Sequence, residues 1–192
     1  MKAVLVIDMT EYFLQDKAKN DLENKINNIK SVIETGVENE MPLYFFEFLF
    51  QDVYRAGFNS ATNDVIVKSW TYPTIKELKE VVKDYDKACF FLKENYDCFL
   101  SKPFKNKVKE ESIDELVVTG CNVGVCVKNT VRKALTKDLG VVTSESVLLA
   151  NKSDLEEMNQ SIRYFRKKGV YVKDSVADLI EGLNCLSFLN YS

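Results

Sequence analysis

Short runs of apolar residues, rich in β-branched and aromatic side chains, recur along the chain. They predict strands at Ala3–Ile7, Leu43–Leu49, Val65–Val67, Ala88–Leu92, Glu115–Thr119, Gly140–Thr143 and Val170–Val172. Most of these runs are apolar at nearly every position, which is typical of strands buried on both faces of a parallel sheet.

Between most of these strands, apolar residues return at every third or fourth position, as they do on one face of a helix. Such stripes predict helices over residues 22–33, 75–85, 127–135 and 155–165, followed by a short helix at 176–182. Two of them open on a capping box, formed by Thr74 with Glu77 and by Ser153 with Glu156. The segment Gln51–Asn63 has no clear period and is predicted to be a long loop.

This alternation of strands and helices predicts an α/β fold. We expect a doubly wound, mainly parallel six-stranded sheet with helices on both faces, a Rossmann-like three-layer sandwich. No repeat or flexible linker divides the sequence, so residues 1–192 are expected to form one domain. Ligands of such sheets bind beyond the carboxyl ends of the strands, which directs attention to the residues that follow each strand.

Charge and hydropathy narrow the classes of partner. The chain has 26 Lys and Arg against 29 Asp and Glu, a net charge of −3, which argues against a nucleic-acid or anionic membrane surface. No apolar stretch approaches the roughly 18 residues of a membrane span, and the run at the N-terminus is too short for a signal peptide. We therefore expect a cytoplasmic protein with reduced cysteines that acts on a small molecule.

The sequence contains no histidine. This excludes histidine-based metal sites, a Ser-His-Asp triad and a Cys-His dyad. Any acid–base chemistry therefore belongs to carboxylates, lysines, tyrosines or cysteines.

Three chemically capable residues stand just after predicted strands: Asp8, Lys93 and Cys126. Cys126 is expected to begin a helix, where the helix dipole and free backbone N–H groups would lower the pKa of its thiol and could form an oxyanion hole. A nearby ammonium would stabilise the thiolate, and a carboxylate could carry its proton. Taken singly, each residue also has a structural explanation: Asp8 could be a turn cap, Lys93 a solvated side chain and Cys126 a small core residue.

The sequence around these residues resembles the isochorismatase-like cysteine hydrolases. The similar segments are Val4–Met9 with Phe13, Lys93 with Tyr96–Phe99, and Leu116–Gly120 with Cys126, Val127 and Thr130. Their order and spacing match from residue 3 to about residue 173. Nicotinamidases of this family bind a metal through an Asp and histidines, and that site cannot exist in this chain.

The resemblance implies a cysteine amidohydrolase. Because the chain has no histidine, we expect it to need no metal, and we expect no cofactor. Cys126 would attack the carbonyl of a small amide, ureide or carbamate, Asp8 would take the thiol proton, and Lys93 would hold the two in register. Backbone N–H groups of Cys126 and Asn122 would bind the oxyanion, and water would hydrolyse the thioester. The family's cis peptide would fall at Cys121–Asn122.

Other features concern the surroundings of this site. Phe13 and Trp70 are candidate walls of a substrate pocket, with core packing as the alternative for Phe13. The family commonly has Thr two residues before the nucleophile, where this chain has Gly124. This departure leaves open a second reading, a catalytically weak member that acts as a small-molecule-binding or thiol-redox protein.

The remaining cysteines, Cys89, Cys98 and Cys185, are predicted to be structural. The apolar segment Leu186–Leu189 is a candidate contact with a second subunit, so we expect a homo-oligomer.

Overall fold

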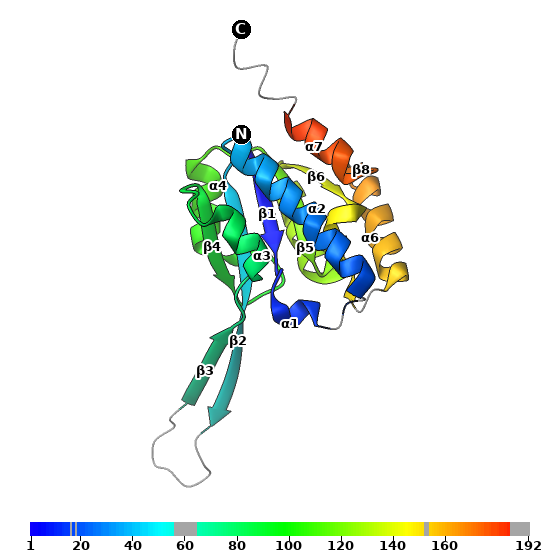
Figure 1. The fold of residues 1–192 in the computed structure, drawn as a ribbon. Coiled ribbons are helices and arrows are strands. Elements are labelled where there is room, and N and C mark those ends of the chain that lie inside the picture. Colours follow the sequence, from blue (N-terminus) through cyan, green and yellow to red (C-terminus); the bar gives the residue numbers. More distant parts are fainter. Residues whose placement is uncertain (16, 18, 56–64, 152–153, 185–192) are drawn as a thin grey trace.

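A computed structural model of the chain describes residues 1–15, 17, 19–55, 65–151 and 154–184 (Figure 1). Several sequence-based expectations lie outside these residues: Ser153 as a helix cap, Cys185, the segment 186–189, and most of the loop predicted at 51–63.

Six mutually parallel strands form the centre of the sheet. In spatial order they are β4 (Ala88–Lys93), β2 (Leu43–Arg55), β1 (Lys2–Ile7), β5 (Glu115–Cys121), β6 (Gly140–Ser144) and β8 (Tyr171–Lys173). The mainly parallel α/β sheet is thereby confirmed. The described residues include two further strands, which makes eight instead of six: β7 (Leu148–Leu149), parallel to the end of β5, and β3 (Val65–Thr71), antiparallel to β2.

Helices cover both faces of the sheet because successive residues of each strand point to opposite sides. On one face, α2 (Lys19–Glu38), α3 (Lys76–Lys79) and α7 (Val176–Asn184) pack over Val4 and Val6. On the other face, α4 (Lys102–Glu110), α5 (Lys128–Leu135) and α6 (Leu155–Lys167) pack over Leu5 and Ile7. The predicted three-layer arrangement is confirmed. Among the described residues, no helix is long and apolar enough to cross a membrane.

The helix starts differ from the predicted capping boxes. The N-cap of α3 is Ile75, and Thr74 instead donates its backbone N–H to a carboxylate oxygen of Glu47 at 2.7 Å. At α6 the cap is Asp154, whose carboxylate accepts from the backbone N–H groups of Glu156 and Glu157. Aspartate is as good an N-cap as serine, so the sequence allowed either start.

The outer half of β2 leaves the body of the molecule and pairs with β3 to form a two-stranded arm (Figure 1). The prediction of a loop at Gln51–Asn63 is therefore wrong for Gln51–Arg55, which continue the strand. Cross-strand side-chain pairs stabilise a hairpin, and local periodicity in the sequence does not show which residues pair. One such pair is Phe50 with Trp70, whose rings stack at 5.7 Å.

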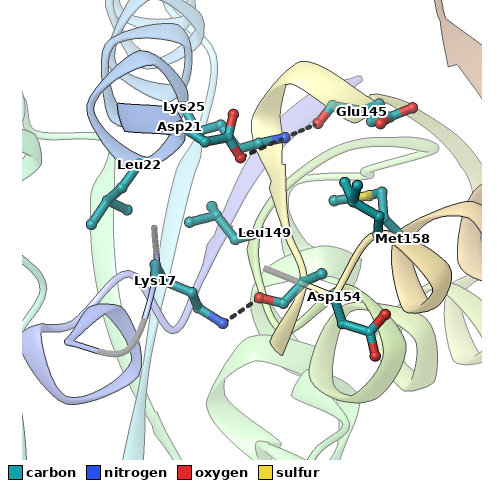
Figure 2. A pocket seen from close by; sticks show the side chains of 10 residues that line it. Lys17, Asp21, Leu22, Lys25, Glu145, Leu149, Asp154 and Met158 are labelled. Atoms are coloured by element: carbon teal, nitrogen blue, oxygen red, sulfur yellow. Dashed lines mark hydrogen bonds and ion pairs between the residues drawn. The ribbon is translucent and has the colours of Figure 1, made fainter. Parts of the chain in front are cut away.

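A cavity of about 350 Å³ lies where the first turns of α2 and α6 face each other (Figure 2). Leu22 and Met158 form part of its apolar wall, and Lys17, Lys25 and Asp154 contribute charges. Lys17 belongs to the connection between α1 (Glu11–Leu14) and α2.

Candidate active site

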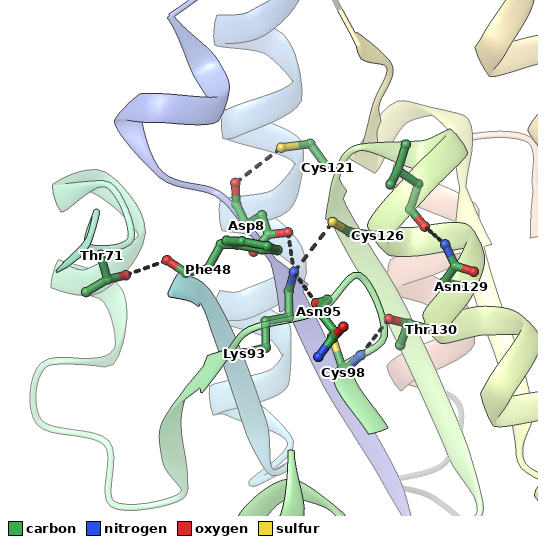
Figure 3. Close-up of polar contacts among 11 residues, drawn as sticks. Asp8, Phe48, Thr71, Lys93, Asn95, Cys98, Cys121, Cys126, Asn129 and Thr130 are labelled. Atoms are coloured by element: carbon green, nitrogen blue, oxygen red, sulfur yellow. Dashed lines mark hydrogen bonds and ion pairs between the residues drawn. The ribbon is translucent and has the colours of Figure 1, made fainter. Parts of the chain in front are cut away.

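Asp8, Lys93 and Cys126 meet at the carboxyl edge of the sheet (Figure 3). Asp8 directly follows β1, and Lys93 is the last residue of β4. Cys126 belongs to η3 (Val123–Val127), a π-helical turn between β5 and α5, so it precedes the regular helix instead of beginning it. Parallel strands end at the same edge, which is why residues so distant in sequence are neighbours here.

Lys93 stands between the other two side chains. Its Nζ atom lies 2.8 Å from Oδ2 of Asp8 and 3.5 Å from Sγ of Cys126. It also donates to the backbone oxygen of Asn95 at 3.2 Å. Lys93 therefore joins the Asp8 carboxylate to the Cys126 thiol, and these two groups are close enough for the carboxylate to raise the pKa of the thiol.

All three side chains are shielded from solvent: Asp8 is 0%, Cys126 2% and Lys93 3% exposed. Burial raises the pKa of Asp8, and burial together with the Asp8 carboxylate raises the pKa of Cys126 to about 12; the Lys93 ammonium opposes both shifts. Burial lowers the pKa of Lys93, but its two partners outweigh this and the net shift is upward. The expected lowering of the Cys126 pKa is therefore wrong, and Cys126 rests as a thiol.

A close approach of β5 to β1 brings the loop 120–126 beside Asp8; because this loop carries the candidate nucleophile Cys126, we name it the nucleophile loop. A Cβ atom on Gly120 would lie 2.1 Å from the backbone oxygen of Ile7, and Gly120 has a φ of 107°, so only glycine fits there. Asp8 also lies in the left-handed region, with a φ of 51°, which aspartate tolerates better than most residues. Its backbone N–H donates to the backbone oxygen of Phe46 in β2 at 3.0 Å, which fixes its position beside that strand.

The peptide bond between Cys121 and Asn122 is cis, as the resemblance implies. The buried Cys121 thiol donates to the backbone oxygen of Asp8 at 3.2 Å. The backbone oxygen of Asn122 accepts from Val125 and Val127, which links it to the π-helical turn. Cys121 therefore ties the loop to Asp8, and Asn122 leads directly into the turn that carries Cys126.

Two other cysteines have surroundings typical of structural residues. Cys98 is fully buried, and its backbone N–H donates to Oγ1 of Thr130 at 3.1 Å. Cys89 is half-buried on β4, away from the end of the strand that carries Lys93.

The two candidate pocket walls belong to one aromatic cluster beside Lys93. We use this name for Tyr12, Phe13, Phe48, Phe50, Trp70, Tyr72 and Tyr96, which are joined by ring contacts. Phe48 is the member nearest the site, with its ring centre 4.6 Å from Nζ of Lys93. Phe13 contacts the rings of Phe48 and Phe50, whereas Trp70 reaches Phe48 only through Phe50. Trp70 therefore lies at the outer side of the cluster.

Sequence reasoning missed Phe48 and Lys17. Phe48 was counted as part of an apolar strand, and no pattern marked that its ring would cover Lys93. Lys17 lies in a polar stretch where a solvated lysine is the rule, yet it is only 8% exposed and its ammonium bonds to the Asn122 side chain at 2.7 Å. The sequence carried no signal for this contact.

Within the described part of the chain, no three His, Cys, Asp or Glu side chains are gathered so that they could hold a metal ion.

Comparison with known proteins agrees with this architecture. No curated protein matches the sequence, but solved structures share the fold. The nicotinamidase SaPncA from Staphylococcus aureus is 19% identical with a TM-score of 0.71, covering 90% of this chain and 96% of its own. The N-carbamoylsarcosine amidase from Thermoplasma acidophilum is 18% identical with a TM-score of 0.67, covering 90% and 95%.

A third structure of this fold is the YcaC gene product from Escherichia coli, an octameric hydrolase of unknown specificity. It is 16% identical with a TM-score of 0.67, covering 90% of this chain and 74% of its own. Residues 2–175 match the isochorismatase domain family, which is nearly the whole chain. The chain therefore belongs to the isochorismatase family.

Proposed function

We propose that this protein is a metal-independent cysteine hydrolase that cleaves the C–N bond of a small amide, ureide or carbamate. The contact of one buried ammonium with both a carboxylate and a thiol carries the proposal, since Lys93 lies 2.8 Å from Asp8 and 3.5 Å from Cys126. Such a group of nucleophile, base and orienting charge is what nucleophilic catalysis requires. The occurrence of a nicotinamidase and an N-carbamoylsarcosine amidase on the same fold supports this reaction class.

The first half of the reaction forms a thioester. Cys126 starts as a thiol, and the Asp8 carboxylate accepts its proton while Sγ attacks the carbonyl carbon of the substrate. The π electrons of the carbonyl move to its oxygen, and the backbone N–H groups of Asn122 and Cys126 stabilise that charge. When the intermediate collapses, Asp8 returns the proton to the leaving nitrogen, and ammonia or an amine departs.

The second half hydrolyses the thioester. Asp8 takes a proton from a water molecule, the hydroxide attacks the thioester carbon, and Sγ leaves and regains a proton. Lys93 keeps its charge throughout, because the carboxylate and the thiol hold its pKa above the ordinary value. It thereby keeps Asp8 and Cys126 in contact and stabilises the thiolate as it forms.

Phe13 and Trp70 are proposed to contact the part of the substrate that does not react. Both belong to the aromatic cluster beside Lys93, and Trp70 is 40% exposed, so its ring is available to a ligand. Flat aromatic surfaces favour a planar or apolar group next to the reacting carbonyl.

One observation favours a second function, a small-molecule-binding or thiol-redox protein. The Cys126 thiol is buried and neutral at pH 7, which makes an unassisted attack slow. A binder would take up one ligand for each chain and release no product, whereas the hydrolase turns over.

A screen for ammonia release separates the two functions. Small amides, ureides and carbamates are incubated with the native protein, with Cys126→Ala, and with Cys89→Ala as a matched control outside the site. We expect turnover by the native protein and by Cys89→Ala, and none by Cys126→Ala. Turnover that persists in Cys126→Ala contradicts the proposal.

A homo-oligomer is part of the same proposal. The octameric state of the YcaC gene product, which has this fold, supports it. Light scattering of the purified protein checks it, and a monomer at micromolar concentration contradicts it.

A further inference from the structure

Lys17 makes contacts that are unusual for a lysine in a loop. It is 8% exposed, and its ammonium donates to Oδ1 of Asn122 at 2.7 Å and to the backbone oxygen of Ala150. Burying an ammonium is costly unless its protons find good acceptors. Two of its donors are directed at the carboxyl edge of the sheet, and one of the acceptors belongs to the nucleophile loop.

These bonds join three connections of the fold. Lys17 lies nine residues after Asp8, in the segment that follows β1 and α1. Asn122 directly follows β5, and Ala150 directly follows β7. A single ammonium therefore links the segment after α1 to the residues that directly follow β5 and β7.

Asn122, which accepts this bond from Lys17, also carries one of the proposed oxyanion donors. Its peptide unit joins the cis bond after Cys121 to the turn that carries Cys126, and its backbone oxygen accepts from Val125 and Val127. The backbone N–H groups of Asn122 and Cys126 are the oxyanion donors in the proposed mechanism. Oxyanion donors act by being fixed in place before the charge develops, so a side-chain bond that restrains Asn122 bears directly on them.

We propose that Lys17 is a positioning residue: by holding the Asn122 side chain against Ala150, it fixes the loop whose backbone N–H groups stabilise the oxyanion. The inference rests on the proposed function and names a residue that acts on the transition state without touching the substrate. The positive charge of Lys17 also lies close enough to the loop to lower the pKa of Cys121, although burial of that thiol raises its pKa overall.

Lys25 provides a matched control in the same region (Figure 2). It lines the same cavity, donates to the backbone oxygen of Glu145 at 2.8 Å and lies 3.9 Å from Asp21. None of these groups belongs to the nucleophile loop. A variant at Lys25 therefore removes a lysine of similar setting and leaves Asn122 untouched.

Two reactions of Cys126 separate positioning from general stability. Iodoacetamide alkylates the thiol at a saturated carbon: an S–C bond forms, iodide leaves, the thiol proton passes to the solvent, and no oxyanion arises. Butanal adds reversibly: Sγ bonds to the carbonyl carbon, the π pair moves to oxygen, and the thiol proton ends on that oxygen to give a hemithioacetal. The affinity for butanal, measured as protection of Cys126 from iodoacetamide with peptide mapping, therefore depends on the oxyanion donors.

We expect Lys17→Met to be alkylated at Cys126 within about twofold of the native rate but to bind butanal roughly 10-fold more weakly, a smaller loss than removal of an oxyanion donor itself. Asn122→Ala, which removes the acceptor, should show the same weakening, and the double variant should show no further loss because both changes break one link. Lys25→Met should match the native protein in both reactions. With a substrate from the ammonia screen, Lys17→Met should lower kcat and leave KM nearly unchanged.

Native affinity for butanal in Lys17→Met overturns the inference. Additive losses in the double variant overturn it too, because they would show that Lys17 does not act through Asn122. If Lys17→Met fails to fold, Asn122→Ala decides alone, and native affinity in that variant is the contradicting result. Failure of the proposed function has a different signature: butanal then gives no protection of Cys126 even in the native protein.

Discussion

The ammonium of Lys93 lies 2.8 Å from a carboxylate oxygen of Asp8, and both side chains are almost completely buried. Removing one partner of a buried pair leaves the other charge without compensation, which costs about 3–5 kcal/mol. We therefore expect Asp8→Ala to lower the free energy of unfolding by that amount, measured by urea denaturation. The double variant Asp8→Ala/Lys93→Met should regain most of the stability and none of the activity.

An exposed pair serves as the control for this prediction. Lys30 and Glu34 lie 3.8 Å apart on the surface of α2, where solvent screens their attraction. Glu34→Ala should change the free energy of unfolding by less than about 0.5 kcal/mol. An equal cost at the two sites would show that burial does not strengthen the Asp8–Lys93 pair.

Gly124 in the nucleophile loop packs directly against the side chain of Glu157. A Cβ atom on Gly124 would lie 2.2 Å from Oε1 of Glu157, whose other oxygen accepts from the backbone N–H of Asn151 at 2.6 Å. The space that the family's Thr side chain would need is thus filled by the Glu157 carboxylate.

We expect Gly124→Ala to displace Glu157 and to cost about 1 kcal/mol of stability through the lost hydrogen bond to Asn151. In a Glu157→Ala background the same change should be neutral or stabilising, because alanine reduces the entropy of the unfolded chain. Denaturant unfolding of the four proteins of this cycle provides the measurement. An equal loss of unfolding free energy on Gly124→Ala in both backgrounds would show that Gly124 is not required by the packing of Glu157.

Much of this site could be predicted from the sequence, and the reasons are physical. Apolar runs predict the parallel strands, and parallel strands end at one edge, so Asp8, Lys93 and Cys126 were expected at the same edge. Their direct contact also depends on the strand order β4-β2-β1-β5, which the sequence pattern does not give. Lys17 could not be found in this way, because a loop lysine is usually solvated and only the three-dimensional path of the chain brings it to Asn122. The two-stranded arm of β2 and β3 was not predicted for a related reason. Phe50 and Trp70 stabilise each other across the strands, and local periodicity does not show such pairs.

The direction of the Cys126 pKa could not be read from the sequence either. A position at the start of a helix favours the thiolate, but in the structure burial dominates and raises the pKa from 9.0 to about 12. Burial depends on how the loop packs against Asp8 and β1, which is a property of the whole fold.

This upward shift predicts how stability depends on pH. A thiol whose pKa is higher in the folded chain contributes stability that is complete below pH 9, its unfolded value, and that is lost as the pH rises toward about 12. Between pH 8 and pH 10 the native protein should therefore lose more free energy of unfolding than Cys126→Ser, by about 1 kcal/mol. Parallel pH profiles of the two proteins would show that the Cys126 thiol is not shielded from ionisation.

The place of Trp70 in the aromatic cluster predicts that its loss weakens substrate binding without slowing the chemical step. Trp70 contacts Lys93 only through Phe50 and Phe48, so Trp70→Ala should leave kcat nearly unchanged. Loss of one aromatic contact with the substrate, worth about 1 kcal/mol, should raise KM roughly fivefold. Tyr171→Ala is the matched control, since Tyr171 is an exposed aromatic residue on β8 at the opposite edge of the sheet. A fall in kcat with unchanged KM in Trp70→Ala would contradict a role in the pocket.

The last prediction concerns metal ions. Zinc and similar ions favour imidazole and thiolate ligands, and this chain has no histidine. The proposed chemistry also gains nothing from a Lewis acid, because backbone N–H groups stabilise the oxyanion and Asp8 carries the proton. We therefore expect the hydrolase activity to survive exhaustive dialysis against EDTA, and nicotinamide to be a poor substrate compared with the best compound of the ammonia screen. Activity that disappears in the chelator and returns with zinc or manganese would show that a metal, and not the loop around Asn122, supplies the missing charge stabilisation.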